Sequence, residues 1–236
     1  MERLDKLIAS RLCISRKEVK ALLRRGAVTL NGAVARSAEQ KCAEGDELLV
    51  EGRRLELSRH CYLMLNKPAG VVCATRDKQC GTVLDLVPAE LRRSGLFPAG
   101  RLDKDTEGFV LLTDDGAFAH RILAPRQHVP KTYLARLNAP IDLEQLARAF
   151  GEGVELDGER LRPARLRGIE EGAQPLVELT ICEGKFHQVK RMFALYSREV
   201  LHLRRIRIGA LALDPALPPG GCRALTAGEL EQLSSK

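Results

Sequence analysis

One carboxylate, Asp103, stands in the most distinctive local setting of the chain. It lies between Gly100 and Gly108, which predict a tight turn, and the apolar run 109–112 that follows is typical of a buried strand. An acid held on a rigid turn beside a core strand is fixed in position, as a nucleophile or a general base must be. The simpler alternative is an aspartate that only hydrogen-bonds within its own turn.

Three other segments carry side chains that could serve a site around this acid. They are a strand ending in a Pro-Gly turn (65–70, LNKPAG), a strand with a tyrosine (131–133, KTY) and a basic helix (183–193, EGKFHQVKRMF). Each has an ordinary interpretation, since turns, core tyrosines and basic amphipathic helices are common. The segments lie tens of residues apart, so only tertiary folding could bring them to Asp103.

Taken together, these segments and the run 100–116 (GRLDKDTEGFVLLTDDG) resemble the pseudouridine synthases that act on ribosomal RNA. The resemblance implies that Asp103 is the catalytic carboxylate and that Tyr133 lies against the target base. It also implies that Lys190 pairs with Asp103 and keeps it ionised, as a buried carboxylate requires. Phe109 stands where the family usually has Leu, on the apolar side of the motif.

The implied reaction isomerises uridine to pseudouridine without a cofactor or a metal ion, after the base has been flipped into a pocket. Whether Asp103 acts at C1′, at uracil C6 or on the C2′ proton stays open. We expect Asp105 to have only a turn role, with its side chain directed away from Asp103. Further candidates for contact with the RNA are Arg101, Arg191, Lys67 and His187.

The residues around the basic helix also point to a branch of the family. His187 and Gln188 before Lys190 are most similar to the branch that modifies small-subunit (16S) ribosomal RNA, and the large-subunit (23S) branch is the alternative. We expect His187 to contact backbone or phosphate, and we favour that role over a general base.

The first part of the chain predicts a second, smaller module. Ser15 and Glu18 form a capping box between two short helices, and Asn31-Gly32 is a strong hairpin signal after the strand 27–30. This helix–helix–hairpin order resembles the S4-type RNA-binding domain. The exposed helix faces are expected to carry the basic side chains, which are Arg3, Lys6, Arg11, Arg16, Lys17, Lys20, Arg24 and Arg25.

The charge distribution favours a polyanionic partner. The net charge is +7, and residues 1–25 hold eight Lys or Arg against three acids, while residues 185–207 hold seven against one. Aromatic residues make up only 4% and Trp is absent, which argues against broad stacking platforms for single strands. No His, Cys, Asp or Glu group has metal-ligand spacing.

The length of 236 residues and the element pattern predict an α+β protein. We expect an S4-like module over 1–58 and a catalytic domain over 59–236 with a mixed, mostly antiparallel sheet, and we interpret the polar residues 51–60 as a linker between them. The predicted strands of the larger domain are 62–65, 109–113, 132–137, 161–169, 176–182 and 200–208. Its predicted helices are 117–123, 143–150, 187–196 and 227–233.

The remaining expectations concern the setting and the rival functions. The sequence has no signal core or membrane span, and its seven Cys are scattered, so we expect reduced thiols in the cytoplasm. We also expect a monomer that acts on ribosomal RNA in a pre-30S particle. One rival is a non-catalytic RNA-binding assembly factor, for which the S4-like module would suffice. The other is a hydrolase, which would need a second carboxylate a few ångströms from the first.

Overall fold

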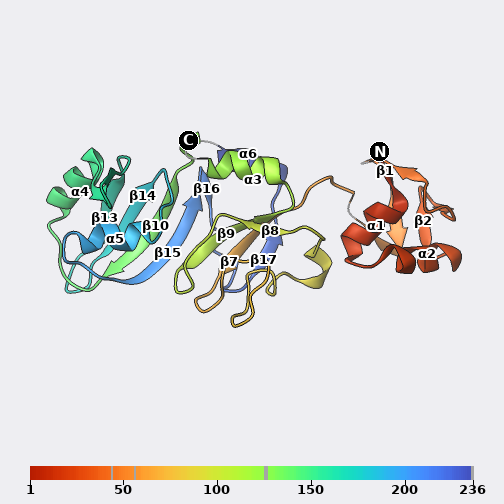
Figure 1. The fold of residues 1–236 in the computed structure, drawn as a ribbon, viewed down its shortest axis with the longest axis horizontal. Helices are drawn as coiled ribbons and strands as arrows, with labels where there is room; N and C mark the ends of the chain where they lie inside the picture. Colours follow the sequence, from red (N-terminus) through yellow and green to blue (C-terminus); the bar gives the residue numbers. More distant parts are fainter. Residues whose placement is uncertain (44, 56, 125–126, 235–236) are drawn as a thin grey trace.

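The computed structural model describes residues 1–43, 45–55, 57–124 and 127–234. Figure 1 shows a small N-terminal module beside a larger part that is built around one long sheet. The elements of the module are β1 (Glu2–Arg3), α1 (Leu4–Leu12), α2 (Arg16–Arg24), β2 (Val28–Leu30), β3 (Ala33–Val34), β4 (Lys41–Cys42), β5 (Leu48–Val50) and β6 (Arg53–Arg54).

The predicted helix–helix–hairpin order of the module is confirmed. The Ser15 hydroxyl accepts from the Glu18 amide, and the Glu18 carboxylate accepts from the Ser15 amide, which together complete the predicted capping box at α2. Asn31 and Gly32 have φ values of 50° and 78°, as a two-residue hairpin turn between β2 and β3 requires. Leucines of α1 and α2 pack on β2 and β5 in one core.

The prediction of a polar linker over 51–60 is partly wrong. Its first residues form a hairpin turn, and Arg53 and Arg54 then pair with β5 as the edge strand β6. Leu57 is buried in the core of the module. Charged side chains are common on an exposed edge strand, because they discourage pairing with other chains. The polar composition of this edge strand therefore resembled that of a linker.

The larger part begins at β7 (Tyr62–Lys67), and its sheet has the strand order β13-β14-β10-β15-β9-β7-β17. Strands β9 and β15 run parallel and the other paired strands run antiparallel, so the predicted α+β class and mostly antiparallel sheet are confirmed. The other strands are β8 (Phe97–Ala99), β9 (Glu107–Thr113), β10 (Lys131–Leu137), β11 (Glu155–Leu156), β12 (Glu159–Arg160), β13 (Arg165–Glu170), β14 (Leu176–Ile181), β15 (Val200–Ile208), β16 (Leu211–Ala212) and β17 (Cys222–Ala224). The helices are η1 (Ala89–Leu91), α3 (Gly116–Leu123), α4 (Leu143–Glu152), α5 (Gln188–Ala194) and α6 (Ala227–Ser234).

The central strands are buried on both faces. Val110 and Leu112 of β9 belong to one core cluster, with α4 and α5, whereas Phe109 and Leu111 belong to another, with α3 and α6. A strand covered on both sides has no polar face, which is why its sequence is a continuous apolar run. This strand is therefore a fixed support for the loop that precedes it.

One predicted strand begins later than expected. The prediction ran from Leu161 to Ile169, but β13 starts at Arg165. Leu161 and Ala164 are buried, and their amides donate to the carbonyls of Val154, just after α4, and of Phe150, in its last turn. Their apolar side chains therefore serve the packing of α4 and not a strand of the sheet.

Candidate active site

The loop that carries Asp103 connects β8 to β9 and depends on glycine at both ends. Gly100 and Gly108 have φ values of 88° and 99°, in the region that other residues rarely adopt. A Cβ atom on Gly108 would lie 2.2 Å from the Arg205 carbonyl oxygen, because β9 and β15 approach each other closely there. The Thr106 amide donates to the Asp103 carbonyl at 3.1 Å, which closes the turn. The glycine-bounded turn predicted from the sequence is therefore present.

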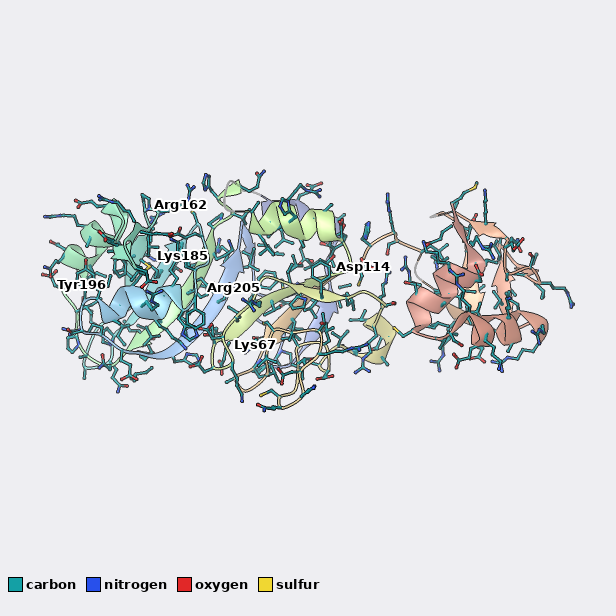
Figure 2. All side chains as sticks on the ribbon, viewed as in Figure 1. Lys67, Asp114, Arg162, Lys185, Tyr196 and Arg205 are labelled. Atoms are coloured by element: carbon teal, nitrogen blue, oxygen red, sulfur yellow. The ribbon has the colours of Figure 1, made fainter. Side chains whose placement is uncertain are left out.

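Lys67 fixes this loop through hydrogen bonds to its backbone carbonyl oxygens. Its side chain is fully buried at the end of β7, and its ammonium donates to the carbonyl oxygens of Pro68, Lys104 and Thr106 at 3.1, 3.1 and 2.7 Å. Burial lowers the pKa of Lys67, and the three carbonyl dipoles compensate for the lost water. Figure 2 shows Lys67 among the strands of the larger part. The prediction that Lys67 contacts RNA is wrong, because the lysine has no exposed surface.

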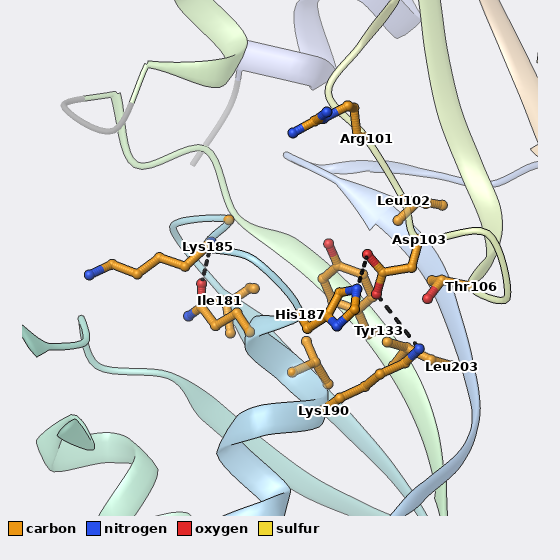
Figure 3. A pocket seen from close by; sticks show the side chains of 13 residues that line it. Arg101, Leu102, Asp103, Thr106, Tyr133, Ile181, Lys185, His187, Lys190 and Leu203 are labelled. Atoms are coloured by element: carbon orange, nitrogen blue, oxygen red, sulfur yellow. Dashed lines mark hydrogen bonds and ion pairs between the residues drawn. The ribbon is translucent and has the colours of Figure 1, made fainter. Parts of the chain in front are cut away.

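Asp103 and Tyr133 line the same cavity, which is open to solvent. Tyr133 comes from β10 and is 6% exposed, and the apolar side chains of Ile181 and Leu203 from the neighbouring strands complete the wall (Figure 3). The strand alternation places Tyr133 on the face of β10 that α5 covers. The cavity therefore combines a carboxylate and other polar side chains with the Tyr133 ring and two aliphatic side chains, which suits a planar ring with polar edges.

Two cationic or ionisable side chains of the α5 region face the carboxylate. The His187 Nε2 atom lies 3.5 Å from Asp103 Oδ1, and the Lys190 ammonium lies 3.7 Å from Asp103 Oδ2 (Figure 3). The pairing of Lys190 with Asp103 that the resemblance implies is present in the structure. The His187 contact was not predicted, because an αL residue (φ 49°) before a helix has no clear sequence signal.

Asp105 departs from its predicted role. Its two carboxylate oxygens both lie 2.7 Å from the Lys190 ammonium, closer than those of Asp103. The expectation that Asp105 points away and acts only in the turn is wrong. The hydrogen bond from Lys190 is the main cause that lowers the pKa of Asp105. Lys190 is therefore shared between two carboxylates of one loop.

The helix α5 is positioned by its buried face. Val189, Met192 and Phe193 pack into the core, so Lys190 lies on the side that faces the cavity. Gln188 is also buried and fixes the loop before the helix. Its side-chain oxygen accepts from the Lys185 amide at 2.9 Å, and its side-chain nitrogen donates to a carboxylate oxygen of Glu183 at 3.0 Å.

The two predicted arginine contacts differ in position. Arg101 is exposed and lines the cavity. Arg191 does not line it, since its guanidinium pairs with Asp157 in the turn between β11 and β12. The helical period puts Arg191 on a different side of α5 from its neighbour Lys190. Its pairing with Asp157 is a contact between distant segments, which the sequence does not reveal.

The basic side chains of the N-terminal module are exposed, with one exception. Arg11 is buried, and its guanidinium donates to the carbonyl oxygens of Ser58 and Arg59, so the expectation that it belongs to the exposed face is wrong. Within the described ranges, Arg3 pairs with Asp5 and Glu39, Lys6 with Glu2, and Arg25 with Glu51. Of the eight basic residues predicted for the helix faces, the exposed ones with no ion pair to a described acid are Arg16, Lys17, Lys20 and Arg24.

Among the described residues, no group of three or more His, Cys, Asp or Glu side chains is arranged to hold a metal ion. Among the helices of the described ranges, none combines the length and apolarity needed to cross a bilayer.

Comparison with known proteins gives two family matches. Residues 61–195 match the family model described as RNA pseudouridylate synthase, and residues 2–48 match the S4 domain. The chain is 42% identical to the ribosomal small subunit pseudouridine synthase A of Escherichia coli over 231 residues, covering 97% of this chain and 98% of the other.

Two further relatives are similar over nearly their whole length. An uncharacterized RNA pseudouridine synthase of Bacillus subtilis is 44% identical over 235 residues, covering 98% of both chains. A crystal structure of a pseudouridylate synthase is 40% identical, with a TM-score of 0.66, and covers 99% of this chain and 100% of the other.

Proposed function

The chain belongs to the RNA pseudouridylate synthase family and acts as an isomerase on RNA, and from this premise we propose that it converts one uridine of small-subunit (16S) ribosomal RNA to pseudouridine. Relatives over 40% identical carry the small-subunit name, which supports this branch over the large-subunit one. The observation that supports the reaction most directly is Asp103 on a glycine-bounded loop at the edge of the Tyr133 cavity.

The reaction needs a positioned carboxylate and an extruded base. The N1–C1′ bond of the uridine breaks, the uracil turns, C5 bonds to C1′, and the C5 proton leaves while N1 takes up a proton. The target nucleotide must leave its stack to reach a site that is enclosed by strands. Asp103 starts the cleavage of the glycosidic bond, and Tyr133 lies against the uracil ring.

Lys190 and His187 orient the carboxylate. Both contact Asp103 from α5 or the residue before it, so the carboxylate is held between the loop of β9 and the helix. Arg101 at the cavity rim is suited to a phosphate of the flipped nucleotide. Arg191 takes part only if its pair with Asp157 opens when RNA binds.

The two modules have different roles, RNA binding and catalysis. We place the RNA-binding module at 1–58, since Leu57 belongs to its core, and the catalytic domain at 59–236, whose core begins at Cys61. The basic helices bind ribosomal RNA through its phosphates. The proposed substrate is a pre-30S particle in the cytoplasm, and the proposed enzyme is a monomer.

Release of tritium from C5 tests the function. Ribosomal RNA carrying [5-³H]uridine is incubated with wild-type protein and with Asp103→Asn, which keeps the size of the side chain and removes its charge. We expect release from small-subunit RNA by the wild type and none by the variant, with similar RNA affinity and thermal stability. Release from large-subunit RNA alone would contradict the proposed substrate, and near-normal release by Asp103→Asn would contradict the role of Asp103.

A further inference from the structure

Phe186 is the aromatic side chain that the fold leaves in water. It is 75% exposed, whereas the other five phenylalanines and the three tyrosines are buried or half-buried in the described structure. A phenyl ring on a surface has no polar group to satisfy there, and burying it on binding is favourable. The exposed Phe186 ring therefore marks a surface that a binding partner would cover.

The loop that carries Phe186 is anchored by hydrogen bonds on both sides of the residue. The side chain of the buried Gln188 accepts a hydrogen bond from the Lys185 amide and donates one to the Glu183 carboxylate, both of which precede Phe186 in the chain. The Gln188 amide also donates to the Lys185 carbonyl at 3.1 Å. The backbone around Phe186 is thus held at both ends, so the exposed ring is presented in a fixed place and not left on a loose loop.

The ring also has a fixed neighbour at the cavity. Phe186 stacks on the imidazole of His187, with ring centroids 3.8 Å apart and an angle of 19° between the planes. The same imidazole lies 3.5 Å from Asp103 (Figure 3). Lys185 and His187 line the cavity, but Phe186 between them does not. The phenyl ring therefore lies outside the cavity, one stacked ring away from the carboxylate.

We propose that Phe186 stacks on the nucleobase next to the flipped uridine, as a nucleobase-binding residue outside the catalytic cavity. Extrusion of one base leaves its neighbour in the strand without a stacking partner, and a flat apolar ring can replace that partner. The occupant of the cavity itself already has Tyr133, so the Phe186 ring serves an adjacent base. This inference rests on the proposed function, because it needs an RNA substrate with an extruded base.

The test combines a protein change with an RNA change. The modified uridine is first mapped in small-subunit RNA with wild-type protein. Short RNAs containing that site are then made with a normal base, or with an abasic nucleotide, on the 5′ or the 3′ side of the target. Phe186→Ala should raise KM and Kd for the normal RNA by about 5- to 150-fold, the range that stacking on one base supplies. It should have no further effect on the RNA that is abasic at the stacked position.

Three other variants make the outcome specific. Phe186→Trp should restore affinity, whereas Phe186→Leu, which is apolar but not flat, should behave like Phe186→Ala. Leu195→Ala removes another exposed apolar side chain, 52% exposed at the end of α5, and should leave both constants unchanged.

The two ways of failing are distinct. Absence of turnover of small-subunit RNA by the wild type would overturn the proposed substrate and this inference with it. If the wild type shows normal turnover, two results would overturn the stacking role alone. One is an equal loss of affinity for Phe186→Ala on the normal RNA and on both abasic RNAs. The other is no loss of affinity on any of them.

Discussion

The Lys190 ammonium lies 2.7 Å from both carboxylate oxygens of Asp105 and 3.7 Å from Asp103. Asp105 is 72% exposed at its side chain, whereas Asp103 is 28% exposed and faces the cavity. The more exposed acid therefore makes the closer contact with the shared lysine. We propose that Asp105 is a positioning residue, which keeps the ammonium beside Asp103 through its own contact with Lys190.

Substitution of Lys190 and of Asp105 should have unequal effects. Lys190→Met removes the cation from both carboxylates, and we expect kcat to fall by on the order of 10²-fold, the usual effect of misplacing a reacting group. Asp105→Asn keeps a hydrogen-bond acceptor for Lys190, and we expect kcat to stay within about tenfold of the wild type. Single-turnover rates on one RNA measure both. A larger loss for Asp105→Asn than for Lys190→Met would contradict the assignment.

Much of the fold and part of the site could be predicted because local chemistry specifies them. The capping box at Ser15 and the Asn31-Gly32 turn each fix a backbone conformation through their own atoms. The apolar run after Gly108 marks a strand that is buried on both faces. The spacing of Val189, Met192 and Phe193 places Lys190 toward the cavity.

The remainder depends on contacts between distant segments. A buried lysine such as Lys67 cannot be distinguished from an RNA-binding lysine until three backbone carbonyls are seen around it. Arg11 is buried because carbonyl oxygens near residue 58 meet it. The pairing of Asp105 with Lys190 likewise joins side chains 85 positions apart. Periodicity describes one element at a time and does not contain such information.

Tyr133 should act through its ring. Tyr133→Phe keeps the stacking surface, and we expect RNA affinity and turnover close to the wild type. Tyr133→Ala should weaken binding by about 1–3 kcal/mol, the usual contribution of stacking on one base. Because Tyr133 is 6% exposed, thermal unfolding of each variant must accompany the binding measurement. A Phe variant as inactive as the Ala variant would instead assign a proton transfer to the hydroxyl.

The exposed basic side chains of α2 should contribute to affinity through phosphate contacts. Changing Arg16, Lys17 and Lys20 together to Gln should weaken RNA binding at low salt and flatten its salt dependence. Each lost contact removes roughly 0.7–0.9 from the slope of log K against log salt concentration. Lys41→Gln, an exposed lysine on β4, is the matched control. An unchanged slope in the triple variant would mean that this helix face does not touch RNA.

Acid should weaken the attachment of α6 to β17. The Arg223 guanidinium donates to both oxygens of Glu229, at 3.0 and 2.7 Å, and to Asp214 at 2.7 Å. The hydrogen bond from Arg223 is the main cause that lowers the pKa of Glu229 to about 2. Since this pKa lies below its value of about 4.3 in an unfolded chain, the stabilisation is complete above about pH 4.3 and is lost as the pH falls toward 2.

Glu229→Gln should therefore lower the free energy of unfolding by about 1–3 kcal/mol at pH 7, as expected for a hydrogen-bonded, half-buried charge pair. Urea unfolding of the wild type and the variant between pH 7 and pH 3 measures the difference. The two curves should converge as the pH falls below about 4.3, because the wild-type carboxylate then gains its proton preferentially in the unfolded chain. Glu144→Gln, on the exposed side of α4, should show no such difference. A constant gap between wild type and Glu229→Gln at every pH would mean that the variant acts through packing and not through the charge pair.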